Sequence, residues 1–402
     1  MRYVVAGGWV TGTTAAQQLR KLDPSAEIVI VDAEPVPYYS RPDLIDYIAG
    51  RKSRDQLFMH DAAWYTENAL ALMSGRRLVG AEPAEHQIML DDGAILSYDR
   101  LLLANGASPF VPPVPGRELP GVLTLRTLED ADNVLANIRP GETAVVVGGG
   151  VLGLEVARAI TERGMSATVV EFASRLLPNQ LDEYGASLLV EHLKTLNITP
   201  IVAAESEKIL EGENGAAGVV LKDGRVLPGS FVLFSIGVRP NILIAQQAGI
   251  ATGRGVKVND FMQTSAPDIY AAGDVAEHRG RVYGVIPPCL EQARIAAQNM
   301  VSPGSATYEG SVMSSSLKTC GVDVLSMGLV NPSPEQNVEV ITAKGAATYR
   351  KVVLDQGTIV GAILYGTTVG TQPLQRAMRA HAKLDQFRER LQDPDWDLSG
   401  IQ

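Results

Sequence analysis

Residues 145–171 read VVVGGGVLGLEVARAITERGMSATVVE, and this segment constrains the fold more than any other. An apolar run leads into a glycine-rich turn, a helix-compatible stretch follows, and a second β-type run ends on Glu171. This order predicts a βαβ unit that binds a dinucleotide. In such a unit Gly148 permits the tight turn, Gly150 lets the backbone approach a pyrophosphate, and Gly153 lets helix and strand pack closely. Glu171 would accept hydrogen bonds from an adenosine ribose and repel a 2′-phosphate, which favours NAD(H); the alternative is a glycine-rich turn without a ligand.

Composition and charge narrow the class of protein. A chain of 402 residues with 46% hydrophobic residues and 39 glycines is typical of a packed α/β protein of two or three domains. The net charge of −10 argues against a nucleic-acid partner or an anionic membrane surface. No apolar run reaches eighteen residues, so no membrane span is expected. A strand-like segment follows Met1 and Arg2 directly, which leaves no room for a signal peptide and predicts a cytoplasmic protein.

Cysteine and histidine usage limits the chemistry. The two cysteines, Cys289 and Cys320, form no CxxC or CxxxxC pair, so a redox-active dithiol of neighbouring cysteines is absent. Each cysteine is expected to be a small buried hydrophobe. The five histidines show no metal-ligand spacing, and no metal site is expected.

The N-terminus repeats the architecture of residues 145–171. The run YVVA leads into Gly7–Gly12, then into TTAAQQLRKL and EIVIVDAE, which ends with the candidate ribose acids Asp32 and Glu34. Trp9 stands where the other turn has Gly150. A bulky side chain there should hinder the approach of a pyrophosphate unless the loop turns the indole outward. The segment is therefore either a second dinucleotide site or a βαβ unit that has kept its fold and lost its ligand.

Several further motifs follow in a fixed order along the chain. They are PYYSRP at 37–42, LLLANGA at 101–107, SIGVRPN at 235–241 and DIYAAGDVAE at 268–277, with related stretches at 307–330 and 357–366. With these motifs and the two glycine turns, the chain resembles the FAD-dependent pyridine nucleotide-disulfide oxidoreductases over nearly its full length. Within them it is most similar to the NADH:rubredoxin oxidoreductase and nitrite reductase flavoprotein branch.

The resemblance implies an α/β fold with two Rossmann-like dinucleotide-binding domains, one for FAD and one for NAD, plus a C-terminal α+β domain. The FAD-binding domain would be discontinuous, formed by residues 1–111 and 241–304. Residues 112–240 would form the NAD(H)-binding domain. Residues 305–402 would form an interface domain that supports a homodimer or caps the flavin face.

The resemblance also assigns site residues. For the ADP half of FAD they are Gly7, Gly8 and Gly12, with Asp32 or Glu34 on the ribose and the backbone of Leu78 on the adenine. Around the flavin they are Arg41, Pro42 and Asp274, the last on the ribityl chain, with further cofactor contacts from Ala104, Asn105, Gly106, Gly237, Gly273 and Ile286. Two candidates for catalysis are Lys318 at the pyrimidine edge and Glu155 at the flavin–nicotinamide junction. The plainer interpretations are a solvated strand lysine for Lys318 and a helix N-terminal acid for Glu155.

Four positions depart from the family pattern. Trp9 replaces a glycine, although the coenzyme A-disulfide reductase branch has a valine there. Asn105 replaces a threonine and keeps the capacity to form hydrogen bonds. Asp46 falls where many relatives carry lysine or histidine beside the flavin. If Asp46 and Glu155 faced one flavin, repulsion between the two carboxylates would raise the pKa of one of them. Ser40 stands where thiol-using relatives carry a cysteine, so their thiol-dependent activities are not expected.

The function implied by the resemblance is electron transfer from NADH through FAD to a separate acceptor. A small redox protein such as rubredoxin or ferredoxin is the expected partner; another flavoprotein subunit, a quinone or oxygen remain open. The alternatives are a flavin-deficient nucleotide-binding scaffold or sensor, and an NADH oxidase.

A closing helix is expected at about 372–392. It would place Arg376, Arg379 and Lys383 on one exposed face. On an acidic protein this basic stripe either docks an acidic electron carrier or is simply a solvated helix face.

Overall fold

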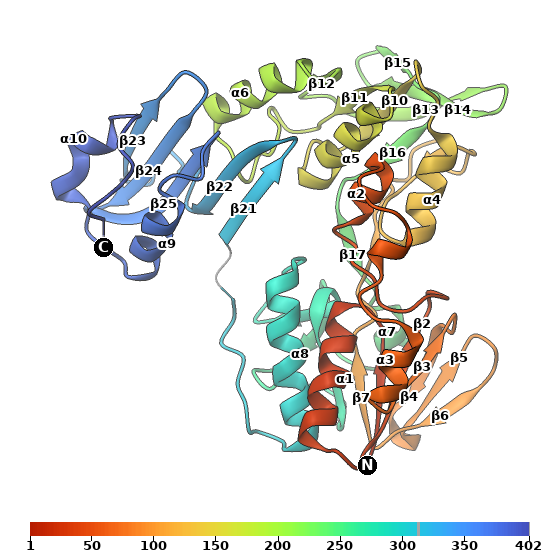
Figure 1. The fold of residues 1–402 in the computed structure, drawn as a ribbon. Coiled ribbons are helices and arrows are strands. Elements are labelled where there is room, and N and C mark those ends of the chain that lie inside the picture. Colours follow the sequence, from red (N-terminus) through yellow and green to blue (C-terminus); the bar gives the residue numbers. More distant parts are fainter. Residues whose placement is uncertain (312–313, 402) are drawn as a thin grey trace.

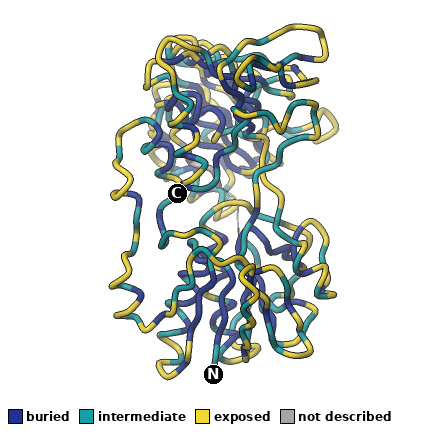
Figure 2. Tube along the Cα trace, turned by 90° about the vertical axis from the view of Figure 1, so that its right-hand side faces the viewer, coloured by how far each residue is buried: buried dark blue, intermediate teal, exposed yellow. Residues whose placement is uncertain are grey.

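Two five-stranded parallel sheets form the cores of two large lobes, and a third, antiparallel sheet lies at the C-terminal end (Figure 1). The computed structural model describes residues 1–311 and 314–401. Buried segments gather inside both large lobes, while their turns face outward (Figure 2). The mixed α/β architecture with two Rossmann-like units confirms the fold class expected from the sequence.

The first lobe has the strand order β19-β7-β1-β2-β3. These strands are β1 (Arg2–Ala6), β2 (Glu27–Asp32), β3 (Leu70–Ser74), β7 (Arg100–Leu103) and β19 (Ile269–Ala271). Helices α1 (Val10–Leu22) and α8 (Ile286–Val301) pack side by side, and α3 (Ala62–Glu67) packs on β3. The central strands are continuous apolar runs because both faces of a parallel sheet are covered; Val4 and Val5 are fully buried.

Smaller elements complete the first lobe. They are the antiparallel sheet β4 (Leu78–Glu82), β5 (Gln87–Leu90) and β6 (Ile95–Ser97), the strand pair β18 (Val256–Val258) and β20 (Ala276–His278), and helix α7 (Leu243–Gln247). Helix α7 packs against β4.

The second lobe has the strand order β12-β11-β10-β16-β9. These strands are β9 (Val122–Leu123), β10 (Thr143–Val147), β11 (Ser166–Val170), β12 (Ile198–Ile201) and β16 (Val232–Phe234). The lobe also holds helices α4 (Leu128–Asn137), α5 (Val151–Glu162) and α6 (Glu183–Lys194), and an antiparallel sheet of β13 (Ser206–Gly212), β14 (Gly215–Leu221) and β15 (Val226–Pro228). The predicted domain limits at 111, 240 and 304 stay predictions, although no strand of this parallel sheet comes from outside residues 122–234 in the described chain.

The two lobes are joined by the chain itself and by helix packing. The chain enters and leaves the second lobe through an antiparallel ribbon of β8 (Ala107–Pro109) and β17 (Val238–Pro240). Helix α2 (Leu44–Ala49) belongs to the N-terminal part of the chain but packs against α4 and α5 of the second lobe. The Arg163 side chain reinforces this contact by donating from Nε to the carbonyl of Ile48 at 2.7 Å.

The C-terminal sheet has the order β21-β22-β25-β24-β23. Its strands are β21 (Ser314–Thr319), β22 (Val322–Gly328), β23 (Glu339–Lys344), β24 (Tyr349–Asp355) and β25 (Thr358–Tyr365). The sheet docks on the second lobe through Asp182, which caps α6 and accepts hydrogen bonds from Tyr349 Oη at 2.6 Å and Lys351 Nζ at 3.0 Å.

The predicted closing helix at 372–392 is wrong in its extent. Helix α9 (Thr371–Arg379) stops early, and a 3-10 turn at Asp385–Phe387 and the short α10 (Arg388–Leu391) follow. Between them the chain runs beside β25: Ile359 donates its N–H to the Ala382 carbonyl, and His381 has a positive φ of 49°. Lys383 therefore lies outside the helix that carries Arg376 and Arg379, and the three do not form one helical stripe.

Candidate active site

A cavity of about 1180 Å³ opens at the carboxyl ends of β1, β2 and β7 in the first lobe. This edge is where parallel α/β sheets bind ligands. Ten of the predicted cofactor-binding residues line it: Gly7, Gly8, Asp32, Glu34, Arg41, Leu78, Ala104, Asn105, Gly106 and Asp274. The start of α4 and Arg239 to Gln247 also contribute lining residues, so the cavity reaches the junction between the lobes.

The first glycine turn has the geometry of a dinucleotide loop. Gly7 has a φ of 118°, and a Cβ there would lie 2.2 Å from the Ala104 carbonyl oxygen. A Cβ on Gly12 would lie 1.7 Å from the Gly7 carbonyl oxygen, so neither position accepts a side chain. Helix α1 starts at Val10 with no side-chain cap and no acidic residue in its first turn. Its N-terminal N–H groups are left available to an anion.

Strand register separates the two candidate ribose acids. The N–H of Gly7 donates to Val31 and that of Gly148 to Val170, each at 2.7 Å, so Asp32 is the counterpart of Glu171. Asp32 lies under Gly8, where an added Cβ would be 2.5 Å from Oδ2. Glu34 instead pairs with Arg41 at 2.6 Å and accepts a hydrogen bond from the Tyr39 hydroxyl.

Burial and the neighbouring Glu34 raise the pKa of Asp32 to about 6. An acid whose pKa is higher in the folded than in the unfolded protein lowers the free energy of unfolding as the pH rises. The loss occurs between the unfolded-state pKa, near 4, and the folded-state pKa. We therefore expect Asp32→Asn to stabilise the FAD-free protein by about 3 kcal/mol at pH 7, and by about half as much at pH 5. Urea denaturation between pH 5 and 8 measures this difference.

The same substitution should weaken FAD binding, because an amide is a poorer acceptor for ribose hydroxyls than a carboxylate. Glu27→Gln on the same strand, where the side chain is 59% exposed, is the matched control and should change neither property. A pH-independent effect of Asp32→Asn would contradict the assignment of a raised pKa.

Arg126 is a functional candidate that the sequence reasoning missed. Its Nη2 forms an ion pair with Asp274 Oδ2 at 2.6 Å, and both side chains line the cavity. Its position is fixed because Thr127 and Asp130 form a reciprocal capping box at the start of α4, and Asp130 also accepts the Arg126 N–H. The pattern Thr127-x-x-Asp130 is a sequence signal that could have identified Arg126, because it predicts that a helix starts directly after this residue.

Asn105 links the cavity to the connection between the lobes. Its Nδ2 donates to the Asn241 carbonyl at 3.0 Å, and Asn241 Nδ2 donates to the Asn105 carbonyl at 2.7 Å. The Asn105 Oδ1 is buried and has no partner among the described residues. Asn105 therefore forms hydrogen bonds, as expected, and its Oδ1 is left as a free acceptor among the described residues.

The second glycine turn has the geometry of the first, but Gly150 stands in it where the first turn has Trp9. Gly148 has a φ of 119°, and a Cβ on Gly153 would lie 2.0 Å from the Gly148 carbonyl oxygen. Gly150 has an extended backbone, φ −79° and ψ 178°, which any residue can adopt, and a Cβ there would meet nothing within 4 Å. No protein atom therefore requires a glycine at this position. The space in front of the loop is open, and a phosphate could approach the backbone there.

Glu171 is held ready beside this loop. Its Oε2 accepts the Gly149 N–H and its Oε1 the Ala173 N–H, both at 2.7 Å. Helix α5 also begins without a side-chain cap or an acidic residue in its first turn. The second loop therefore presents free helix N–H groups and one fixed carboxylate, which fits NAD(H).

Other predicted residues lie outside the cavity lining. Pro42 and Gly237 are exposed, Ile286 begins α8, and Gly273 packs against Thr11. Lys318 is exposed on β21. Their roles toward a cofactor stay predictions.

Glu155 and Asp46 have protein partners of their own. Glu155 accepts the backbone N–H of Cys320 in the turn between β21 and β22, and burial raises the pKa of Glu155. Asp46 pairs with Arg51 at 2.7 Å, and Arg51 also contacts Glu162. Each acid has its own hydrogen-bond partner, and neither lines the cavity.

Both cysteines are buried, as expected from the sequence. Burial raises the pKa of each thiol to about 12. Across residues 1–311 and 314–401, no group of three His, Cys, Asp or Glu side chains is placed to hold a metal ion. In the same ranges, every helix is too short or too polar to span a bilayer.

Known proteins share this architecture. The nitrite reductase [NAD(P)H] of Bacillus subtilis (strain 168) is 35% identical over 364 residues, which is 90% of this chain and 45% of that protein. The rubredoxin-NAD(+) reductase of Alcanivorax borkumensis is 29% identical, covering 91% of this chain and 95% of that protein. The solved NADH:rubredoxin oxidoreductase from Clostridium acetobutylicum has a TM-score of 0.82 at 26% identity, covering 96% of each chain. This chain spans about half or less of the bacterial nitrite and nitrate reductase relatives it matches.

Two family models cover most of the sequence. Residues 1–299 match pyridine nucleotide-disulphide oxidoreductase, and residues 314–382 match the rubredoxin NAD+ reductase C-terminal domain. Proteins of this family use FAD and NAD(H), so both cofactor predictions are confirmed at the family level. The chain belongs to the pyridine nucleotide-disulphide oxidoreductase family.

Proposed function

We propose that this protein takes electrons from NADH through FAD and passes them to a separate small redox protein of the rubredoxin or ferredoxin class. The observation that carries the proposal is the pair of matching glycine loops, of which the second keeps open space in front of Gly150. Bound FAD would supply the redox chemistry by accepting hydride from NADH and releasing electrons singly or in pairs. A cytoplasmic location and a homodimer stay predictions within this proposal.

The chain's own residues would bind and orient the cofactors. Gly7 and Gly8 with the start of α1 would face the FAD pyrophosphate, Asp32 would accept the adenosine ribose hydroxyls, and Asp274 would accept a ribityl hydroxyl. For NAD(H), Gly150 would admit the pyrophosphate and Glu171 would bind the ribose. These assignments rest on the cavity, the strand register and the hydrogen bonds described above.

The relatives support a protein acceptor. One is named a rubredoxin-NAD(+) reductase, and another is the ferredoxin--NAD(+) reductase component of the Paraburkholderia xenovorans biphenyl dioxygenase system. The C-terminal match to the rubredoxin reductase domain supports the same class of partner. A second candidate function is an NADH oxidase, favoured by a relative of that name from Methanocaldococcus jannaschii at 33% identity over 77% of this chain.

Purified protein tests the proposal directly. We expect a yellow protein whose flavin absorbance is bleached by anaerobic NADH, and which reduces added rubredoxin or ferredoxin faster than it consumes oxygen. Rapid oxygen consumption without a carrier would favour the oxidase. A colourless protein that does not take up FAD would overturn the proposal and leave a nucleotide-binding scaffold.

A further inference from the structure

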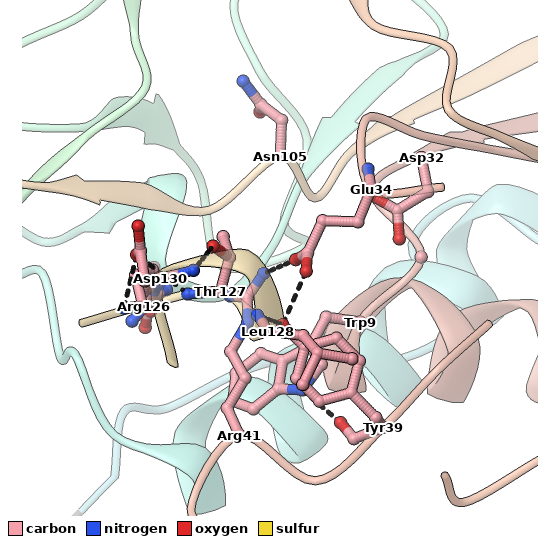
Figure 3. A network of polar contacts seen from close by, with 12 residues as sticks. Trp9, Asp32, Glu34, Tyr39, Arg41, Asn105, Arg126, Thr127, Leu128 and Asp130 are labelled. Carbon is pink, nitrogen blue, oxygen red and sulfur yellow. Dashed lines mark hydrogen bonds and ion pairs between the residues drawn. The ribbon is translucent and has the colours of Figure 1, made fainter. Parts of the chain in front are cut away.

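Trp9 occupies the loop position where the second lobe has Gly150, yet it leaves the loop backbone almost unchanged. Its φ of −83° and ψ of −162° are close to the −79° and 178° of Gly150. The side chain is turned aside by one hydrogen bond, from indole Nε1 to the Tyr39 carbonyl at 2.8 Å. Figure 3 shows the indole lying against Arg41, with its N–H directed to Tyr39. The large residue therefore does not distort the turn.

Two arginines lie over the indole ring. The Cζ of Arg41 is 4.6 Å and that of Arg126 is 5.8 Å from the ring centroid, both within the range of a cation–π contact. Arg41 follows β2 and Arg126 precedes α4, so the indole gathers charges from distant parts of the chain. All three side chains line the cavity. Two guanidinium groups held close together repel each other. The negative face of the Trp9 indole ring reduces the free-energy cost of this repulsion.

Both arginines have hydrogen-bonding capacity left over. Arg41 pairs with Glu34 and Arg126 with Asp274, in each case through Nη2 at 2.6 Å. The Nε–H groups of Arg41 and Arg126 are buried and have no acceptor among the described residues. A buried donor without a partner is unfavourable unless a ligand supplies one. Guanidinium groups with free N–H donors match the oxygen geometry of phosphates.

We propose that Trp9 is a positioning residue for the FAD pyrophosphate: its indole holds Arg41 and Arg126 so that their guanidinium groups bind the phosphates. The first loop then uses side-chain cations in addition to the helix N-terminus, whereas the second loop uses close backbone approach at Gly150. In this view Trp9 strengthens FAD binding and is not an obstacle to it. The inference rests on the FAD site assigned above.

The opposite view, in which Trp9 blocks the site, makes the opposite prediction. Trp9→Gly restores the usual motif and should then improve FAD binding. If Trp9 positions the arginines, we expect Trp9→Gly to weaken FAD binding about 10-fold or more. Trp9→Phe keeps an aromatic face and should stay within about 3-fold of the unaltered protein. Trp9→Leu fills similar space without an aromatic face and should behave like Trp9→Gly.

The experiment titrates FAD into the full-length protein after its own flavin has been removed, following flavin fluorescence at several salt concentrations. Competition by ADP and by riboflavin separates the two halves of the cofactor. We expect Trp9→Gly and Trp9→Leu to lose ADP competition and salt dependence, while riboflavin, which carries no phosphate, competes as before. A general structural defect would weaken both competitors equally.

Three results would overturn the inference: tighter or unchanged FAD binding by Trp9→Gly, equal behaviour of Trp9→Phe and Trp9→Leu, or equal loss of ADP and riboflavin competition. If Trp9→Gly does not fold, the Phe and Leu pair still decides the outcome. None of these results changes whether the unaltered protein binds FAD and is bleached by NADH, so the proposed function is judged separately.

Discussion

Gly150→Val is expected to weaken NADH binding by at least about 100-fold, which corresponds to about 2.7 kcal/mol. The valine backbone fits the extended φ and ψ at this position, and its Cβ meets no protein atom. The added side chain therefore occupies the space that a pyrophosphate would enter. Anaerobic stopped-flow measurement of flavin bleaching against NADH concentration gives the apparent affinity.

Three internal comparisons make this prediction specific. FAD content and thermal stability should stay close to those of the unaltered protein, because the first lobe is untouched. Gly150→Ala should give a smaller loss of NADH affinity. Gly153→Ala, in the first turn of α5, should instead destabilise the fold, because its Cβ would lie 2.0 Å from a carbonyl oxygen. Normal NADH affinity in Gly150→Val would show that the pyrophosphate does not approach this loop.

Asp182→Ala is expected to destabilise the docking of the C-terminal sheet by about 4 kcal/mol. The change leaves the Lys351 ammonium, which is only 8% exposed, without its carboxylate, and removes the cap of α6. Burial would raise the pKa of Asp182, but hydrogen bonds from Tyr349, Gly185 and Lys351 outweigh it and hold the pKa below its usual value. The contact therefore contributes fully at neutral pH and is lost only as pH falls through that lowered pKa.

Fluorotryptophan labelling measures this effect where it occurs. Trp396 is the one tryptophan in the sequence after residue 64, and it packs in the core of the C-terminal sheet, so its fluorine signal reports unfolding there. In urea, this signal should change at a lower concentration in Asp182→Ala. The double variant Asp182→Asn, Lys351→Met should recover much of the stability, since no buried charge is left unpaired. Failure of that rescue would mean that the ion pair is not the main contact.

The glycine loops could be predicted from the sequence because their geometry depends on local spacing. Gly148, Gly150 and Gly153 lie on one turn and the start of one helix, and the acid at the end of the next strand follows from the same unit. The choice between Asp32 and Glu34 could not be made in this way. It depends on how β1 pairs with β2, and on Arg41 taking the carboxylate of Glu34.

Contacts between distant segments account for what the sequence did not predict. Arg126 and Asp274 are 148 residues apart in the sequence, and their ion pair depends on how the two lobes lie together. The orientation of Trp9 depends on a carbonyl group of the loop after β2. The closing helix stopped early because backbone pairing of Ala382 with Ile359 outweighed the helical pattern of its side chains.

The β8–β17 ribbon brings together the two ends of the chain segment that forms the second lobe. Ala107 pairs with Pro240, so the points where the chain enters and leaves this lobe are about one strand spacing apart, roughly 5 Å. A segment whose ends meet can be excised, transplanted or replaced with little change to its host. The ribbon is thus one junction at which the second lobe could be exchanged, provided that the replacement keeps the surfaces that α2 and the C-terminal sheet contact.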